Sequence, residues 1–396
     1  MLFNRNRALQ LMMEEGIDGV VGTCVENISY FTNYYARPFR GVKTTQYYTV
    51  FSRHHFERKA IVLPSIRLPS YVADGFDLSE LYVYGRFSVE RPQTTDDHLF
   101  VKMLVEGLKA DGRFETPFDA LMSALKDLDL LKGTIAVDEM HCTHQQWNRL
   151  ERLLPNAKLV PGYEFIRKIR AIKTTEEIER LQKSVEVIEQ AVLESLAIMR
   201  PGTTERELAN KLQEVIGRLG GIPGVVGLAA GARSAVLLSE SDYRLQRGDQ
   251  IRYDVGCIHN LYWSDIGRNF CLGEPGEKQK NLHAALLEGQ QTAVQSVKPG
   301  VKASDIYWKA VNTIRKAGIP KYERPHCGHG IGLEFYDPPN IRADDNTLLE
   351  EGMVFTIETP YYLVGLGGFQ IEDNAVVTRN GVKLLSNLPR EIIIPI

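Results

Sequence analysis

RYDVGCIHNLYWSDIGRNF, residues 252–270, is the stretch from which the fold and site of this chain are inferred. It predicts a β-hairpin, because two runs of β-branched, aromatic and apolar residues flank His259-Asn260, which suits a two-residue turn. Pairing about that turn places Asp254 directly opposite Asp265, with Cβ atoms about 4.5–5.5 Å apart. Two carboxylates this close repel each other unless a cation or a shared proton lies between them. The hairpin therefore predicts a metal site or a carboxylate dyad, whereas a one-residue register shift would separate the two acids.

A second candidate hairpin carries the same arrangement of acids. Residues 353–359 and 369–378 predict two strands joined by a Gly-rich loop. Pairing about Gly365 places Glu358 opposite Glu372. Two hairpins with facing carboxylates are stronger evidence for a cation site than one.

A histidine between the two hairpins completes the set. In HCGHGIG, residues 326–332, glycines flank one histidine and allow close approach of backbone and ligand. Four carboxylates and one imidazole suit two divalent ions, such as manganese, cobalt, iron or zinc, bridged by shared carboxylates. A mononuclear site would not need so many acids. The expected metal ligands are Asp254, Asp265, His329, Glu358 and Glu372.

The length of 396 residues suits two domains. Residues 1–163 alternate helical and strand patterns, which predicts an α/β domain. Residues 164–396 contain an internal repeat, in which TTERELANKLQEVIGRLG (203–220) and VKASDIYWKAVNTIRKAG (301–318) each follow a Pro-Gly pair. Strand patterns follow both helices. We therefore expect a mixed α/β (α+β) chain whose second domain has two helix-helix-strand units related by a pseudo-two-fold axis.

The composition argues against several kinds of partner. A net charge of -3 and 24% charged residues give no sign of a nucleic-acid surface or a basic membrane patch. No apolar run reaches the roughly 18 residues of a membrane span, and the charged N-terminus lacks a signal-peptide core. The five cysteines include no C-x-x-C pair. We therefore expect a cytoplasmic protein with free thiols and neither nucleic-acid nor membrane partners.

The motifs together resemble the pita-bread metallohydrolases, the superfamily of prolidase, aminopeptidase P, methionine aminopeptidase and creatinase. D-x-G, S-D-x-x-R, G-H-G-I-G, T-I-E-T-P and I-E-D occur in the family's order and hold its five ligands. EEGIDGVVGTCVENISYFTNY (14–34) and the ending NLPREIIIPI (387–396) resemble the prolidase/creatinase branch, which carries an extra N-terminal domain. The resemblance covers essentially the whole chain.

The resemblance implies a metal-dependent hydrolase of the prolidase or aminopeptidase P type, which cleaves an Xaa-Pro-like amide bond with a hydroxide bridging two metal ions. It implies that Asp265, His329, Glu358 and Glu372 hold one ion. Asp254, Asp265 and Glu372 hold the other, and manganese is the first expectation. Glu358 moves a proton from water to the leaving nitrogen, or is a plain ligand. The implied partners are a dipeptide or other small-molecule substrate and a second copy in a homodimer.

Three positions depart from the family's peptidase pattern. Tyr336 stands where peptidases carry a histidine seven residues after the ligand histidine, and Leu238 stands where they carry an upstream histidine. Gln370 replaces the arginine before I-E-D. These departures leave an alternative open: a creatinase-like or ectoine-hydrolase-like C–N hydrolase, or an enzyme like dimethylsulfoniopropionate lyase, acting on a small metabolite.

Several residues are candidates for substrate contact in place of the missing groups. Tyr336 is expected to donate a hydrogen bond to a developing oxyanion, with simple packing against the neighbouring phenylalanine as the alternative. Gln370 is a weaker candidate for the same surface. Arg233, Arg252 and Arg268 are candidates for replacing the lost positive charge, with structural ion pairs as the alternative for each.

Overall fold

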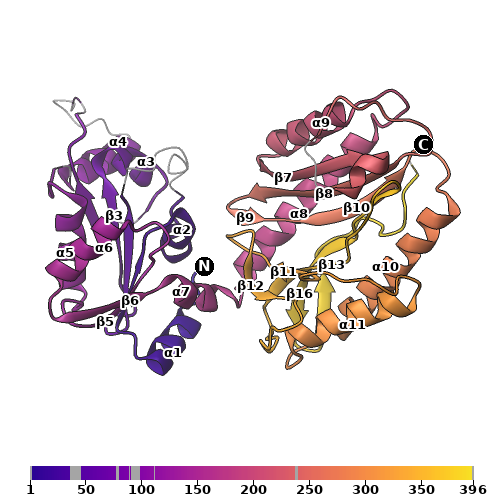
Figure 1. The fold of residues 1–396 in the computed structure, drawn as a ribbon. Coiled ribbons are helices and arrows are strands. Elements are labelled where there is room, and N and C mark those ends of the chain that lie inside the picture. The colour runs from indigo at the N-terminus through magenta and orange to yellow at the C-terminus, as the bar shows by residue number, and fades with distance from the viewer. Residues whose placement is uncertain are drawn as a thin grey trace. The chain divides into compact units, whose positions relative to one another are not determined.

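The computed structural model describes residues 2–35, 46–76, 80–88, 90, 99–110, 112–236 and 240–394. The chain forms two compact units, Met1–Arg170 and Ala171–Ile396, each with helices packed on a β-sheet (Figure 1). The mixed α/β class expected from the sequence is confirmed. No helix in the described part of the chain is long and apolar enough to cross a membrane.

The first unit extends past the boundary expected at 163/164. Helix α7 (Tyr163–Arg170) belongs to it, because the apolar face of that helix is buried and Arg170 Nη1 donates to Asn27 Oδ1 at 2.8 Å. The structure therefore divides the chain between Arg170 and Ala171. An amphipathic pattern shows that a helix needs a partner surface, but it does not show which domain supplies that surface.

The first unit has a six-stranded sheet in the order β4-β3-β2-β1-β5-β6. Helices α5 and α6 cover one face of this sheet, and α2 and α3 cover the other (Figure 1). Alternate strand side chains belong to two separate apolar clusters with these helices. Both faces are covered, which explains why the strands are almost wholly apolar. The strands are β1 (Gly19–Gly22), β2 (Tyr48–Ser52), β3 (Lys59–Pro64), β4 (Leu81–Tyr84), β5 (Gly133–Val137) and β6 (Ala157–Pro161), and the other helices are α1 (Arg5–Glu15), α2 (Val25–Thr32), α3 (Leu68–Ala73), α4 (Leu99–Gly107), α5 (Pro117–Asp127) and α6 (His144–Leu153).

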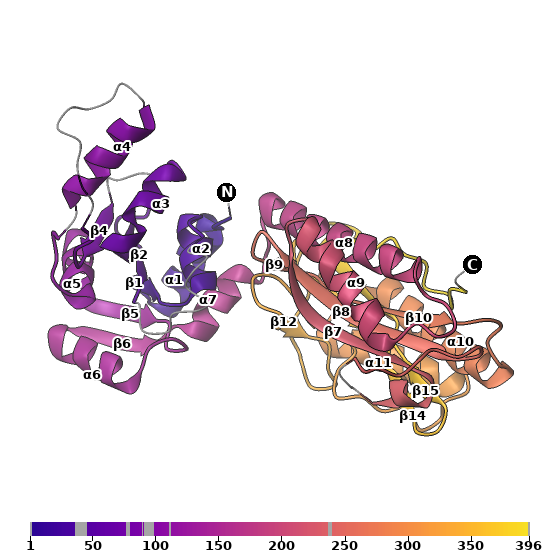
Figure 2. The ribbon, with the colours of Figure 1, turned by 90° about the horizontal axis from the view of Figure 1, so that it is seen from above.

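The second unit has a nine-stranded sheet in the order β12-β11-β13-β16-β10-β8-β7, with β17 beside β16 and β9 beside β8. Helices α8 (Thr175–Leu196) and α9 (Glu205–Arg218) pack on the half with β7, β8 and β10. Helices α10 (Glu277–Ser296) and α11 (Ala303–Lys316) pack on the half with β13 and β16 (Figures 1 and 2). The strands are β7 (Ile222–Ala230), β8 (Gln250–His259), β9 (Tyr262–Trp263), β10 (Ile266–Cys271), β11 (His329–Gly330), β12 (Asp337–Asn340), β13 (Val354–Glu358), β16 (Glu372–Thr378) and β17 (Gly381–Leu384); the ribbon β14 (Tyr361–Leu363) and β15 (Gly367–Phe369) pairs separately.

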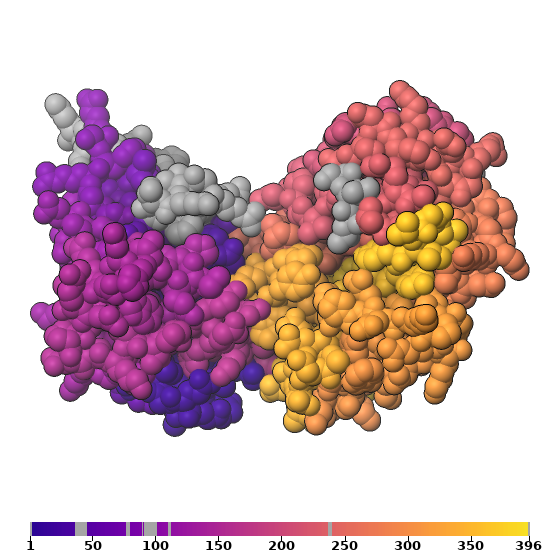
Figure 3. Space-filling view, in the orientation of Figure 1, coloured from indigo at the N-terminus to yellow at the C-terminus, as the bar shows by residue number. Residues whose placement is uncertain are grey.

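The internal repeat is visible in these two helix pairs. Helices α9 and α11 have 14 residues each, and their first residues, Glu205 and Ala303, lie 98 positions apart. Each is preceded by a glycine in the left-handed region, Gly202 (φ 92°) and Gly300 (φ 84°), a conformation that favours glycine. Figure 3 shows the two halves of this unit as a magenta-to-salmon part and an orange-to-yellow part.

The two halves join where β10 runs beside β16, with Gly267 facing Glu372. A Cβ atom at Gly267 would lie 2.1 Å from Cγ of Gln370 and 3.0 Å from Cβ of Glu372, so glycine is required there for reasons of space. Arg268 crosses the same seam, with Nη2 2.6 Å from Asp373 Oδ1. The acids of the candidate site lie on both sides of this seam.

Candidate metal centre

The first hairpin forms, but its register differs from the expected one. The turn is Asn260-Leu261, with φ of 46° and 76°, one residue later than His259-Asn260. Asp254 is therefore paired with Gly267, and the prediction that it directly faces Asp265 was wrong. Because the pairing moves by two residues, from 265 to 267, and strand side chains alternate with a period of two, the two acids stay on one face as diagonal neighbours.

The second hairpin has the expected register. Glu358 at the end of β13 pairs directly with Glu372 at the start of β16. The ribbon β14–β15 continues the same pairing, with Leu363 opposite Gly367, about Gly365, whose φ of 87° requires a residue that tolerates the left-handed region. The facing of these two glutamates is thus confirmed.

Three expected ligands form one compact buried group. The ligating atoms of Asp265, His329 and Glu372 lie within 4.8 Å of one another, and His329 Nε2 is 3.6 Å from Asp265 Oδ2. His329 Nδ1 donates to the carbonyl of Gly330 at 3.0 Å, so in the neutral imidazole the lone pair is on Nε2, the nitrogen that faces the acids. Among the described residues, no other group of three or more His, Cys, Asp or Glu side chains meets this geometry.

The other glutamate of the set is held beside this group by two side chains. Gln370 Nε2 donates to Glu358 Oε2 at 2.8 Å and to Glu372 Oε2 at 3.1 Å. His326 Nδ1 lies 3.0 Å from Glu358 Oε1. Gln370, expected as a weak substrate contact, is thus buried between two of the expected ligands and orients both carboxylates.

The carboxyl groups have perturbed pKa values that fit a cation site. Burial raises the pKa of Asp254 to about 7, and repulsion from Asp265 adds to the effect. Burial also raises the pKa of Asp265, and burial with repulsion from three carboxylates puts the pKa of Glu372 well above its usual range. Burial acts in the same sense on Glu358, but contacts with His326 and then His329 outweigh it, so the pKa of Glu358 is lowered.

Two carboxylate oxygens have no hydrogen-bond partner among the described residues, although both are buried: Asp265 Oδ1 and Glu372 Oε1. Unpartnered buried oxygens, mutual repulsion and one imidazole with its lone pair facing the acids are what a divalent cation would satisfy, since it stabilises the ionised carboxylates. The donor set, rich in oxygen with one nitrogen, fits the first-row divalent ions expected from the sequence.

Tyr336 packs against the ring of His329 and is partly exposed to solvent. Its ring centroid is 4.1 Å from that of His329 and 5.0 Å from that of Phe335, and the residue is 49% exposed. Burial of the hydroxyl raises the pKa of Tyr336 to about 12, with nearby carboxylates adding to the effect. The phenol therefore keeps its proton near neutral pH and is a hydrogen-bond donor at the edge of the site. Leu238 lies outside the described residues.

Two of the three candidate arginines make ion pairs. Arg233, in the short 3-10 helix η4 (Gly231–Ala235), has Nε 3.3 Å from Oε1 of the buried Glu205. Arg268 is paired with Asp373 across the seam. Arg252 has no carboxylate within ion-pair distance among the described residues.

His326 is a site residue that sequence reasoning did not single out. It is the first residue of HCGHGIG, and its side chain reaches Glu358 and is 26% exposed. Its ring centroid is 6.0 Å from that of His329 and 6.2 Å from that of Tyr336. The available signal was its place three residues before His329, with the left-handed Gly328 (φ 137°) between them.

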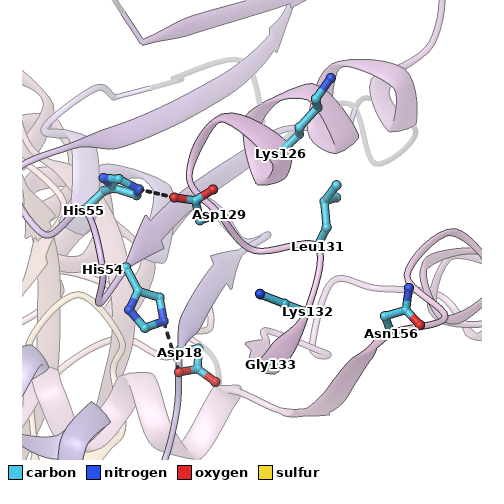
Figure 4. A pocket seen from close by; sticks show the side chains of 9 residues that line it. All are labelled: Asp18, His54, His55, Lys126, Asp129, Leu131, Lys132, Gly133 and Asn156. Atoms are coloured by element: carbon cyan, nitrogen blue, oxygen red, sulfur yellow. Dashed lines mark hydrogen bonds and ion pairs between the residues drawn. The ribbon is translucent and has the colours of Figure 1, made fainter.

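A separate hollow of about 1100 Å³ lies on the first unit (Figure 4). It contains His54, 3.3 Å from Asp18, and His55, 2.6 Å from Asp129. Both imidazoles already contact a carboxylate near the protein surface. Their paired charges give no reason to assign them a role in catalysis.

Comparison with known proteins agrees with this geometry. The profile of metallopeptidase family M24 matches residues 179–379, which is 201 of the 396 residues, and that of the creatinase/prolidase N-terminal domain matches residues 5–172. The chain therefore belongs to metallopeptidase family M24, and its resemblance to the prolidase branch of the pita-bread superfamily is confirmed.

Named relatives and solved structures indicate which members of the family the chain is similar to. It is 38% identical to the Xaa-Pro dipeptidase of Pyrococcus furiosus over 58% of this chain and 67% of the relative. The Xaa-Pro dipeptidase structure from Bacillus anthracis matches with a TM-score of 0.80 and 25% identity over 98% of both chains. The prolidase structure from Pyrococcus furiosus matches with a TM-score of 0.74 and 27% identity, covering 96% of this chain and 100% of that one. The protein is a metal-dependent hydrolase of the prolidase type.

Proposed function

We propose that this protein cleaves the amide bond of Xaa-Pro dipeptides with the help of two divalent ions, for which manganese is the first candidate and cobalt, iron or zinc are alternatives. The main observation in support is the buried group of Asp265, His329 and Glu372, whose ligating atoms lie within 4.8 Å of one another. Glu358 pairs directly with Glu372 in the adjoining strand. The relatives named as Xaa-Pro dipeptidases support the kind of bond that is cut.

Each residue has a proposed part in this function. Asp265, His329, Glu358 and Glu372 hold one ion, and Asp254, Asp265 and Glu372 hold the other. When bound, such ions lower the pKa of water and polarise a carbonyl group. Glu358, whose pKa is lowered despite burial, is ionised and can take a proton from water and pass it to the leaving nitrogen.

The cellular compartment and the oligomeric state are also proposals. The five cysteines are all free, and four of them are buried, which suits a reducing cytoplasm. We propose a homodimer, as in the family that the motifs resemble. Sedimentation at several protein concentrations would measure the oligomeric state directly.

Turnover of a substrate panel tests the proposed bond specificity. Protein loaded with manganese should release proline from Gly-Pro and other Xaa-Pro dipeptides, and treatment with a chelator should abolish that release. Creatine, ectoine and dimethylsulfoniopropionate, incubated in parallel, should remain unchanged. Product analysis by chromatography measures all of these reactions.

The second candidate function is hydrolysis or lysis of a small metabolite by the same centre. One observation favours it: Tyr336 and Gln370 stand where related peptidases carry a histidine and an arginine, and Gln370 is already bonded to two of the expected ligands. Conversion of any of the three metabolites, with no proline released from the dipeptides, would select this candidate and reject the first.

Substitution of Tyr336 by phenylalanine should lower kcat on the best substrate by roughly 10²–10³-fold, if its hydroxyl stabilises the developing oxyanion. Metal content should change little, because Tyr336 stacks on His329 and the ring is retained. The measurement is steady-state kinetics together with metal analysis. Since the phenol has a pKa of about 12, it should add no ionisation to the activity profile between about pH 6 and 8.

Phe335→Leu is the matched control, because it changes the neighbouring ring and leaves the phenol in place. His326→Gln is the informative comparison, since His326 is outside the ligand set and its Nδ1 lies 3.0 Å from Glu358 Oε1. Wild-type kcat/KM in Tyr336→Phe, with a large loss in His326→Gln, would show that Tyr336 only packs and that His326 supplies the missing polar group.

A further inference from the structure

Arg252 is buried, and no carboxylate lies within ion-pair distance of it among the described residues. It lies on β8, two residues before Asp254, so both side chains lie on the same face of the strand. It is 0% exposed, and its side chain makes one hydrogen bond among the described residues, from Nη2 to the carbonyl of Val236 at 3.3 Å. Nε and Nη1 have no partner in that part of the chain. The guanidinium has lost its hydration and gained one hydrogen bond in return, which is costly unless a ligand satisfies Nε and Nη1.

A second arginine approaches the same aromatic ring. The guanidinium carbon of Arg252 lies 4.9 Å from the ring centroid of Tyr362, and that of Arg324 lies 5.1 Å from it. Arg324 Nε is also without a partner among the described residues. The ring attracts each cation, but two cations this close to one ring repel each other. An anion bound to both would remove the repulsion and satisfy the open N–H groups.

This arginine pair borders the metal centre. Arg324 lies two residues before His326, whose imidazole contacts Glu358. Burial raises the pKa of Tyr362, and the negative charges of Asp254 and Glu358 contribute to the rise. Tyr362 is therefore within electrostatic reach of two expected ligands from different halves of the unit. An anion bound here would lie next to the reacting groups.

We propose that Arg252 and Arg324, arranged around Tyr362, bind a carboxylate of the substrate beside Asp254 and Glu358. Guanidinium groups match a carboxylate in geometry and can bind it through two parallel hydrogen bonds. The inference rests on the proposed function in treating this surface as the substrate site. A dipeptide has two possible sources for the carboxylate, its C-terminus and an acidic side chain on its first residue.

If the role of Arg252 is purely structural, the expected effect of its replacement on the melting temperature is different. If Arg252 only balances the charge of the acids, its replacement by methionine should lower the melting temperature. If Arg252 instead serves to bind a ligand, Arg252→Met replaces an incompletely paired buried cation by an apolar side chain of similar length. The melting temperature of the ligand-free protein should then be unchanged or higher.

Calorimetry with two pairs of peptides tests the proposal and separates the two sources. Gly-Pro and glycyl-prolinamide differ in the C-terminal carboxylate, while Glu-Pro and Gln-Pro differ in the side chain. The manganese-loaded protein should favour the charged member of one pair by about 10- to 100-fold, as expected for hydrogen bonds between charged groups. Arg252→Met and Arg324→Gln should each bring that ratio close to one without changing metal content.

Arg206→Met is the control, since Arg206 on α9 is paired with the exposed Asp242 and should leave the ratio unchanged. Heat of turnover gives KM, and heat of binding without turnover gives Kd, so failure of the proposed cleavage is distinguishable from failure of this inference. Equal affinity for both members of both pairs, an undiminished ratio in both variants, or no saturable heat from any of the four peptides would overturn it. Because Arg324 is partly exposed, Arg324→Gln remains informative if Arg252→Met does not fold.

Discussion

Asp265→Asn should abolish metal binding and reduce kcat/KM by roughly 10³–10⁴-fold, which is the rate equivalent of losing several kcal/mol of stabilisation from bound ions. Asp265 is, with Glu372, one of the two expected ligands that both ions share, and its Oδ1 is buried without a hydrogen-bond partner among the described residues. An amide has one weakly charged oxygen and cannot bridge two cations. Metal analysis of the purified variant, beside steady-state kinetics, measures both effects.

The stability of the metal-free variant separates loss of a ligand from loss of the fold. Burial raises the pKa of Asp265 in the folded protein, so its ionised form destabilises the fold when no cation is bound. Metal-free Asp265→Asn should therefore be at least as stable near pH 8 as the metal-free wild type. Asp242→Asn, on the surface of the same unit, is the control. Retention of both ions by Asp265→Asn at ordinary metal concentrations would falsify the bridging part assigned to this residue.

Removal of the metal ions should make the stability of the protein fall as the pH rises. The folded pKa of Asp254 is about 7, against an ordinary value of 3.8, so the folded state holds a proton that the unfolded state releases between these values. Stability contributed by the protonated form is therefore lost as pH rises from about 4 to about 7. The raised pKa values of Asp265 and Glu372 act in the same direction, and the lowered pKa of Glu358 opposes them.

Bound cations should abolish this dependence, because they favour the ionised carboxylates at every pH at which they bind. The measurement is denaturation of chelator-treated and manganese-loaded protein at several pH values, with the difference between the two curves as the result. Glu177, whose pKa burial raises to about 7, affects both curves and cancels in the difference. A difference that does not grow between about pH 4 and 7 would contradict the placement of these acids around a cation.

The two hairpins show how far local sequence determines a register. In the second, glycine at the centre of a symmetric loop is the residue that tolerates a left-handed backbone, so the pairing of Glu358 with Glu372 follows from the sequence. In the first, histidine and asparagine suit the turn better than leucine does. Leu261 nevertheless takes a φ of 76° and is buried, which indicates that tertiary packing outweighs the local preference.

In the candidate site, too, some features follow from local sequence and others depend on the tertiary fold. The residues proposed as ligands can be selected from short motifs, because each motif combines a carboxylate or an imidazole with the glycines or the strand alternation that position it. The arrangement of Arg252, Arg324 and Tyr362 was not accessible, since three distant segments meet only in the folded unit. His326 lay inside a recognised motif, but only the structure shows that its ring faces Glu358 rather than solvent.

The seam between the two repeats has a consequence for the order of events during folding. Asp254 and Asp265 come from one repeat, while His329, Glu358 and Glu372 come from the other, and the repeats join where Gly267 faces Glu372. In the proposed ligand set, neither repeat alone supplies all the ligands of either ion. With these ligands, metal binding requires that both repeats have folded and docked, and we expect a chain stalled halfway through synthesis to lack a complete cation site.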